Sequence, residues 1–265
     1  MRKIKAFFVI SLKNALVYKT QGFIWFLSDV LPILTVMLFF TAVFSERDSV
    51  GKYSLAGILT YYAITLVLNV IVEPHPEYSI MTDINRGFLA TYLLRPLSYL
   101  KFYGITGLAY KITRLIFLLP LIVIFLSFIP EVFANLKFNW WQASGLLLMF
   151  VLAHIIFYFL KAIIGLMAFW FTESYWLIAL FELFSMFFSG LLLPLDLMPK
   201  AFQNLATLLP FKYLVYVPAQ LVLQNISQAD LLINVVIQLI WLVILGISLK
   251  KLWQYGLRTY SAFGG

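Results

Sequence analysis

The chain of 265 residues has no cysteine and carries few charged residues. Without cysteine it can form neither disulfides nor thiolate metal sites, and it offers no thiol nucleophile. Asp, Glu, Lys and Arg make up 11% of the residues, about half of what an ordinary soluble domain carries. The motifs G-x-x-x-x-G-K-[ST], G-x-S-x-G and H-E-x-x-H are also absent, which excludes a phosphate loop for ATP hydrolysis and the common hydrolase signatures.

Hydrophobic residues take the place of charge and make up 63% of the chain. So much apolar surface cannot be covered in water, and we expect an all-α integral membrane protein with one membrane domain. A run of roughly 20 apolar residues crosses the hydrocarbon core as a helix. The apolar runs predict six transmembrane spans, at residues 22–44, 53–72, 104–129, 141–171, 175–193 and 231–249.

The two ends of the chain are basic. In residues 1–20 apolar side chains recur at helical spacing with Arg2 and Lys13 on the other side, which predicts an amphipathic helix at the membrane surface. This start resembles a secretory signal, but Lys13 and Lys19 interrupt its apolar run, so we expect the segment to be retained. Residues 250–265 form a basic tail.

Lys and Arg are unevenly distributed about the predicted spans. They concentrate on the side that holds both termini, whereas the other side has only Arg47, Lys52, Lys137, Lys200 and Lys212. Short cytoplasmic loops carry such an excess, so both termini are predicted to be cytoplasmic. The net charge of +8 also suggests nucleic-acid binding, but most of these residues flank apolar spans, and we expect no nucleic-acid partner.

Residues 77–103 form the longest connection on the predicted cytoplasmic side. Thr82 or Asp83 is placed to cap a short helix that Pro96 ends. This helix either lies in the membrane interface or docks a soluble partner. Gly87 either allows close approach to that partner or bends the helix. The candidate docking residues are Thr82, Asp83, Ile84, Arg86, Gly87, Phe88, Leu93, Arg95 and Pro96.

Some ionisable residues lie within the predicted spans, where a charge is costly unless it is paired or faces a cavity. Similar depths predict two pairs, Lys161 with Glu182 and Asp29 with Lys111, and leave Arg114 without a predicted partner. In one alternative the side chains of Lys111, Arg114 and Lys161 extend to the inner headgroups. In the other, Arg114 or the Lys161–Glu182 pair faces a cleft and meets a substrate headgroup.

The two histidines do not predict a metal site or a catalytic residue. His75 lies in a turn and His154 in the fourth span, and neither has a carboxylate at metal-ligand spacing. We expect His154 to make a polar contact between helices.

Prolines interrupt the apolar stretch "LLLPLDLMPKAFQNLATLLPFKYLVYVP". A span exposed to lipid cannot leave so many backbone carbonyls unpaired. We therefore expect two short helices, at about 201–209 and 213–223, within a re-entrant external hairpin at residues 194–223. The prolines of this hairpin are Pro194, Pro199, Pro210 and Pro218.

The order of these elements resembles the permease subunit of type 2 ABC exporters. Such permeases have an amphipathic first helix, two spans, a cytoplasmic coupling helix, and further spans with a re-entrant hairpin before the last. The segment "INRGFLATYLLRPLSY" is similar to the coupling segment of one branch of that family. The segment "FSGLLLPLDLMPKAFQNLATLLPFKYLVYVP" resembles the proline run of the same branch, and together the two motifs support a likeness over essentially the whole chain.

The resemblance implies a half-transporter in a bacterial or archaeal cytoplasmic membrane. It would pair with a second permease, identical or related, and dock separate ABC ATPase subunits that bind ATP and Mg²⁺. This chain itself would bind no cofactor and would not be an enzyme, and its external hairpin would form a lid above the transport path. The Phe and Met side chains of the fifth span suggest an amphipathic or lipid-like substrate. The alternatives are a passive channel or scaffold and an intramembrane lipid-modifying enzyme.

Overall fold

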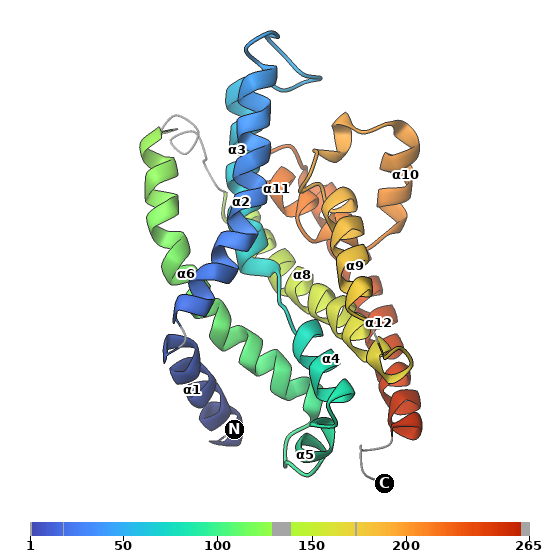
Figure 1. The fold of residues 1–265 in the computed structure, drawn as a ribbon. Helices are drawn as coiled ribbons and strands as arrows, with labels where there is room; N and C mark the ends of the chain where they lie inside the picture. The colour runs from blue at the N-terminus through green and yellow to red at the C-terminus, as the bar shows by residue number, and fades with distance from the viewer. Residues whose placement is uncertain (1, 18, 129–138, 173, 261–265) are drawn as a thin grey trace.

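The computed structural model of the chain describes residues 2–17, 19–128, 139–172 and 174–260 (Figure 1). The long helices of these ranges are α1 Arg2–Val17, α2 Lys19–Val43, α3 Leu55–Val72, α6 Tyr99–Phe128, α8 Trp140–Leu166 and α12 Gln228–Thr259. Helix α1, the short helix α5 (Leu89–Leu93) and the last turns of α12 lie at one end of the bundle, called here the α5 end. The opposite end carries the loop between α2 and α3 and helix α10 (Lys200–Leu208), and is called the α10 end.

Five stretches in the described part of the chain are long and apolar enough to cross a membrane: Gly22–Val43, Leu55–Asn85, Tyr99–Pro120, Trp140–Phe169 and Gln228–Thr259. The predicted fifth span corresponds to α9, Tyr175–Phe188, which has 14 residues. At 1.5 Å per residue α9 is about 21 Å long, shorter than the ~30 Å hydrocarbon core. A bent helix pair of the predicted hairpin supplies a sixth candidate when it is taken as one span.

Helix α3 ends at Val72 and the chain resumes as α4, Glu77–Asn85, after a break that contains Pro74 and Pro76. Proline lacks the backbone N–H that a continuing helix would need and restricts the residue before it. The prediction that Thr82 or Asp83 caps a helix is wrong, because both lie inside α4. The Thr82 hydroxyl instead donates to the carbonyl of Tyr78 one turn earlier.

A short turn separates α4 from α5, Leu89–Leu93. Gly87 in this turn has a φ of 75°, a left-handed conformation that glycine adopts without steric cost. Gly87 therefore turns the chain between two helices, and the predicted single helix between Thr82 and Pro96 is replaced by α4 and α5.

The proline-rich stretch forms two short helices that are close to the predicted ones. Helix α10, Lys200–Leu208, follows Pro199, and Pro210 precedes the turn Phe211–Tyr213 (η3) that leads into α11, Tyr216–Val222. The two arms meet at 81°. Asp196, in the turn η2 Leu195–Leu197, fastens this hairpin to the loop before α3. Its carboxylate lies 2.7 Å from Lys52 Nζ and accepts a hydrogen bond of 3.1 Å from the Tyr53 hydroxyl.

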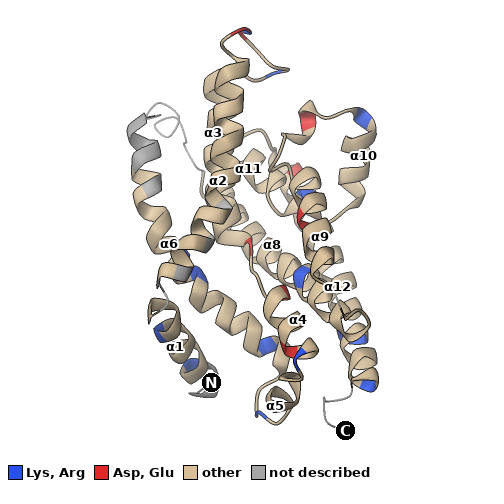
Figure 2. Cartoon of the chain, viewed as in Figure 1, with Lys and Arg blue, Asp and Glu red and all other residues tan. Residues whose placement is uncertain are grey.

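Helices α8 and α12 pack along one another, and α1 packs along α6. At the α10 end, the Gln238 side chain of α12 donates to the carbonyl of Tyr213. At the α5 end, Gly256 of α12 lies against the ring of Phe169, which belongs to the turn η1 Met167–Phe169 after α8. Figure 2 shows Lys and Arg on α1, on the lower part of α6 and on the last turns of α12.

Gly165 allows α4 to approach α8 closely. A Cβ atom built at Gly165 would lie 2.9 Å from the Ile80 Cβ and 3.2 Å from the Glu77 Cα. We predict that Gly165→Ala forces the two helices apart and lowers the free energy of unfolding by about 1–3 kcal/mol. Thermal unfolding of the purified chain in detergent measures this change.

Gly107→Ala is the matched control, because a Cβ at Gly107 of α6 would meet no atom within 4 Å. Alanine is the better helix former, so this control should be as stable as the wild type or slightly more stable. Equal unfolding temperatures for the two variants would contradict the close packing of α4 on α8.

Candidate functional site

Lys161 of α8 is the centre of a buried ionic cluster. Its side chain is completely buried, and its ammonium lies 2.7 Å from Glu182 Oε1 of α9 and 3.4 Å from Glu77 Oε1 of α4. The same ammonium is also in hydrogen-bonding contact with the carboxylate of Glu73. Three carboxylates, from the end of α3, from α4 and from α9, therefore surround one ammonium.

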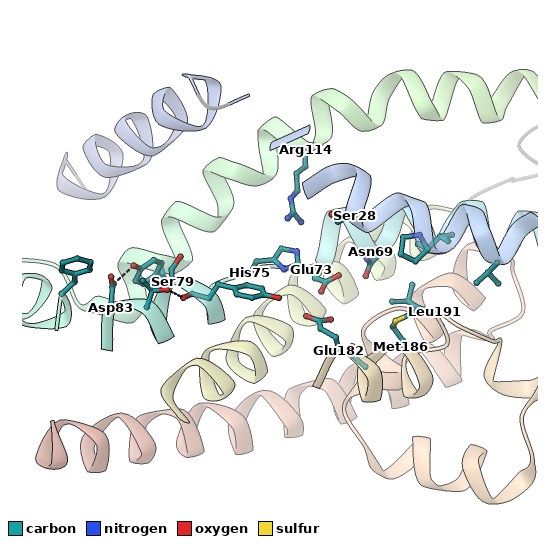
Figure 3. Close-up of a pocket in the computed structure, with 18 residues that line it drawn as sticks. Ser28, Asn69, Glu73, His75, Ser79, Asp83, Arg114, Glu182, Met186 and Leu191 are labelled. Atoms are coloured by element: carbon teal, nitrogen blue, oxygen red, sulfur yellow. Dashed lines mark hydrogen bonds between the residues drawn. The ribbon is translucent and has the colours of Figure 1, made fainter. Parts of the chain in front are cut away.

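The proline break between α3 and α4 brings two of these carboxylates to Lys161. Glu73 caps the end of α3, Glu77 begins α4, and His75 lies between them. Figure 3 shows His75, Glu73 and Glu182 turned toward the same space.

The sequence-based pairing of Lys161 with Glu182 is present in the structure, whereas the alternative in which Lys161 extends to the headgroups is wrong. Sequence reasoning missed Glu73 and Glu77, because the prolines were interpreted only as the end of a helix. The signal was in the sequence: "EPHPE" places two carboxylates beside a helix break that follows an apolar span.

A metal site at this cluster would compete with Lys161. Ligand atoms of Glu73, His75 and Glu182 all lie within 4.8 Å of one another, although the sequence spacing gave no such indication. The Lys161 ammonium, however, already contacts both carboxylates and lies 3.3 Å from His75 Nδ1. A metal ion bound to these atoms would have to displace the ammonium, so the arrangement favours an ionic cluster over a metal centre.

A cavity of about 920 Å³ adjoins the cluster. Residues from α2, α3, α4, α6 and α9 and from the proline break line it (Figure 3). Arg114 of α6 lines this cavity and is 6% exposed. The alternative in which it extends to the headgroups is therefore wrong, and whether it meets a substrate there stays a prediction. Of the carboxylates around Lys161, that of Glu182 is the most exposed, at 34% of its side chain against 8% for Glu73. Glu182 is therefore the member of the cluster that is most accessible from the cavity.

Lys111 and His154 join three helices near the cluster. The Lys111 ammonium of α6 contacts the carbonyl of Ile71 and lies 2.9 Å from His154 Nδ1 of α8. The same His154 nitrogen is 2.8 Å from the carbonyl oxygen of Val72 at the end of α3. The predicted polar contact of His154 between helices is confirmed. The predicted partner of Lys111, Asp29, has a side chain that lies outside the described residues.

The predicted docking residues divide into a buried and an exposed group. Asp83 and Ile84 are buried, and the Asp83 carboxylate accepts hydrogen bonds from the hydroxyls of Tyr99 and Tyr103 of α6, at 2.9 and 2.5 Å. Leu94, which sequence reasoning did not select, is 89% exposed at the end of α5. The exposed predicted residues are Arg86, Phe88, Leu93, Arg95 and Pro96, whereas Thr82 and Gly87 are half-buried.

An isolated Lys161–Glu182 pair would tolerate exchange of its two charges, but this cluster would not. In the double variant Lys161→Glu, Glu182→Lys, the new carboxylate at position 161 faces Glu73 and Glu77. We predict that the double variant remains destabilised by about 3–5 kcal/mol, as expected when a buried charge loses its partners. Thermal unfolding of the single and double variants measures the coupling, and a double variant as stable as the wild type would contradict the cluster.

Comparison with known proteins places this arrangement in a family. The family model described as "ABC-2 family transporter protein" matches residues 30–264, from within α2 to beyond the end of α12. No curated protein matches the chain. The match covers part of the first candidate span and the whole of the four that follow. It also includes the ionic cluster, the proline-rich hairpin and every residue that lines the cavity except Ser28. The chain therefore belongs to the ABC-2 transporter family, as a multi-pass membrane component.

Proposed function

We propose that the chain is one permease half of an ATP-driven exporter of amphipathic or lipid-like substrates. The second half would be an identical or related permease, and ATP and Mg²⁺ would bind to separate ATPase subunits. The cavity of about 920 Å³ among α2, α3, α4, α6 and α9 carries this proposal. It combines ionisable groups with apolar walls inside a bundle of membrane-spanning helices, as a site for an amphipathic molecule requires.

The distribution of basic residues supports an orientation for this permease. Lys and Arg gather at the α5 end (Figure 2), and such an excess is typical of the cytoplasmic side. In this orientation α1, α5 and the last turns of α12 face the cytoplasm of the cell, and α4 runs from the ionic cluster toward that side. The α10 end then faces outward, in the cytoplasmic membrane of a bacterium or archaeon.

The surface of α5 and the turn before it is the proposed ATPase-docking surface. Phe88, Leu93 and Leu94 expose apolar side chains there, and Arg86 and Arg95 are exposed beside them. Exposed apolar residues flanked by cations suit a partner surface with apolar pockets and acidic groups. Membrane lipid is the alternative neighbour of these apolar side chains.

Side-chain contacts of α4 connect the docking surface to the cavity. Asp83 of α4 holds Tyr99 and Tyr103 of α6, and Glu77 at the start of α4 belongs to the Lys161 cluster. We infer that ATP binding closes the ATPase pair, moves α4 and α5, and shifts the walls of the cavity. ATP supplies the energy, and the different contacts of the two states supply the direction.

The hairpin of η2, α10, η3 and α11 is the proposed outer lid. Asp196 ties it to Lys52 and Tyr53 at the α10 end, and α11 packs against α3 and α8. Leu191, just before the hairpin, lines the cavity. A change in the hairpin is therefore placed to open or close the outer side of the cavity.

Purification in mild detergent tests the proposed assembly. A stoichiometric ATPase that hydrolyses ATP in the purified complex supports an exporter half. Ion conductance by the purified chain alone, without an ATPase, would favour a passive channel. Conversion of a lipid substrate by the chain alone would favour an intramembrane enzyme, and either result would overturn the proposal.

The double variant Leu93→Asp, Leu94→Asp tests the docking surface. Both side chains are exposed, so the change should leave the unfolding temperature unaltered while it removes apolar contacts to the ATPase. We predict at least a tenfold loss of copurified ATPase per permease, measured by quantitative immunoblotting and ATP hydrolysis.

Leu208→Asp is the matched control, since Leu208 is a similarly exposed leucine on α10 at the other end of the bundle. This control should retain the ATPase at the wild-type ratio. If the Leu93→Asp, Leu94→Asp variant copurified as much ATPase as the wild type, α5 would not be part of the docking surface.

A further inference from the structure

We propose that the cavity beside the Lys161 cluster binds a cationic amphipath, an amine whose ammonium group meets the carboxylate of Glu182. This inference rests on the proposed function and narrows its substrate class. An amine of this kind carries one positive group and an apolar body, and the two parts have separate binding surfaces in the cavity.

Charge is the first observation. Glu73, Glu77 and Glu182 surround the ammonium of Lys161, so these four side chains include more carboxylates than ammonium groups. The carboxylates of Glu73, Asp83 and Glu182 line the cavity, whereas Arg114 is its one lining Lys or Arg in the described part of the chain. Glu73, Glu77, Asp83 and Glu182 still outnumber the cations Lys161 and Arg114. A further positive charge beside Glu182 would offset part of this excess.

Buried polar atoms without partners are the second, independent observation. Asn69 and Ser185 line the cavity and are 5% and 2% exposed. Within the described residues, neither Asn69 Oδ1 nor Ser185 Oγ has a hydrogen-bond partner. A buried acceptor without a donor is unfavourable, and the N–H groups of a ligand would relieve that cost.

These acceptors lie on the same helix faces as the carboxylates. Ser185 follows Glu182 by three residues in α9, and Asn69 precedes Glu73 by four residues at the end of α3. Residues three or four apart are neighbours on a helix surface. An alkylammonium group has three N–H donors in a tetrahedral arrangement, like a lysine side chain. Glu182, Ser185 and Asn69 together provide acceptors for such a group.

An apolar wall lies beyond the polar groups. Met186 and Leu191 line the cavity, and Figure 3 shows them next to each other, to the right of Glu182. Pro32, Ile33 and Val36 of α2 complete the apolar lining. A hydrocarbon body lies against this wall while the amine remains at Glu182. An anionic amphipath would instead bring its charge toward Glu73, Asp83 and Glu182.

Binding of n-octylamine to the purified chain in lipid nanodiscs tests the inference. Calorimetry at neutral pH, with empty nanodiscs subtracted, compares octylamine with octanoate and octanol, which have the same chain length. We expect saturable binding of one octylamine per chain, at least tenfold tighter than that of either analogue. Glu182→Gln should weaken octylamine binding at least tenfold. The control Glu46→Gln, in the exposed loop after α2, should bind as the wild type does.

Ser185→Ala provides a second variant in case Glu182→Gln does not fold. Because the Ser185 hydroxyl has no partner among the described residues, its removal should not lower the unfolding temperature, yet it should weaken octylamine binding about threefold. Tighter binding of octanoate, or unchanged octylamine binding in folded Glu182→Gln or Ser185→Ala, would overturn the inference. The binding assay contains neither ATPase nor ATP. A failure to bind octylamine would therefore leave the exporter proposal standing. Failure to copurify an ATPase would overturn the exporter proposal without changing the result of the binding assay.

Discussion

A single buried ammonium constrains the arrangement of this membrane protein. Lys161 lies in the interior of a bundle where neither water nor headgroups compensate its charge, so carboxylates must be brought to it. Glu182 comes from α9, and Glu73 and Glu77 come from the two sides of a proline break. Two of the three carboxylates around Lys161 therefore flank the interruption between α3 and α4.

The same cluster lies between the proposed ATPase-docking surface and the proposed outer lid. Helix α4 continues from the cluster toward the docking surface, and α9 continues from it toward the outer hairpin. Because three of the four members belong to different helices, a displacement of α4 changes the field around Glu182 at the cavity wall. In the proposed cycle, contact with a substrate and contact with an ATPase would therefore both involve this one set of ion pairs.

Much of the helical framework could be predicted from the sequence, because hydropathy and proline punctuation are local signals. They predicted the hairpin helices closely, and equal depth on neighbouring spans was enough to pair Lys161 with Glu182. The start of α4 was missed because Thr82 and Asp83 resemble caps, although their side chains bond to α4 itself and to α6. Depth also does not reveal which face of a helix is buried, so the sequence left two alternatives for Arg114, extension to the inner headgroups or a place at a cleft. The convergence of Glu73 and Glu77 on Lys161 depends on tertiary packing of α4 against α8, which no local pattern contains.

Helix α12 runs without interruption for 32 residues, about 48 Å at 1.5 Å per residue and therefore longer than the hydrocarbon core. Gln238 attaches it to the turn before α11, and Gly256 seats it against Phe169 at the other end. Helix α12 also packs along α8, so a tilt of α12 against α8 would disturb the turn before α11 and the turn after α8 together. One continuous helix therefore joins elements at the two ends of the bundle.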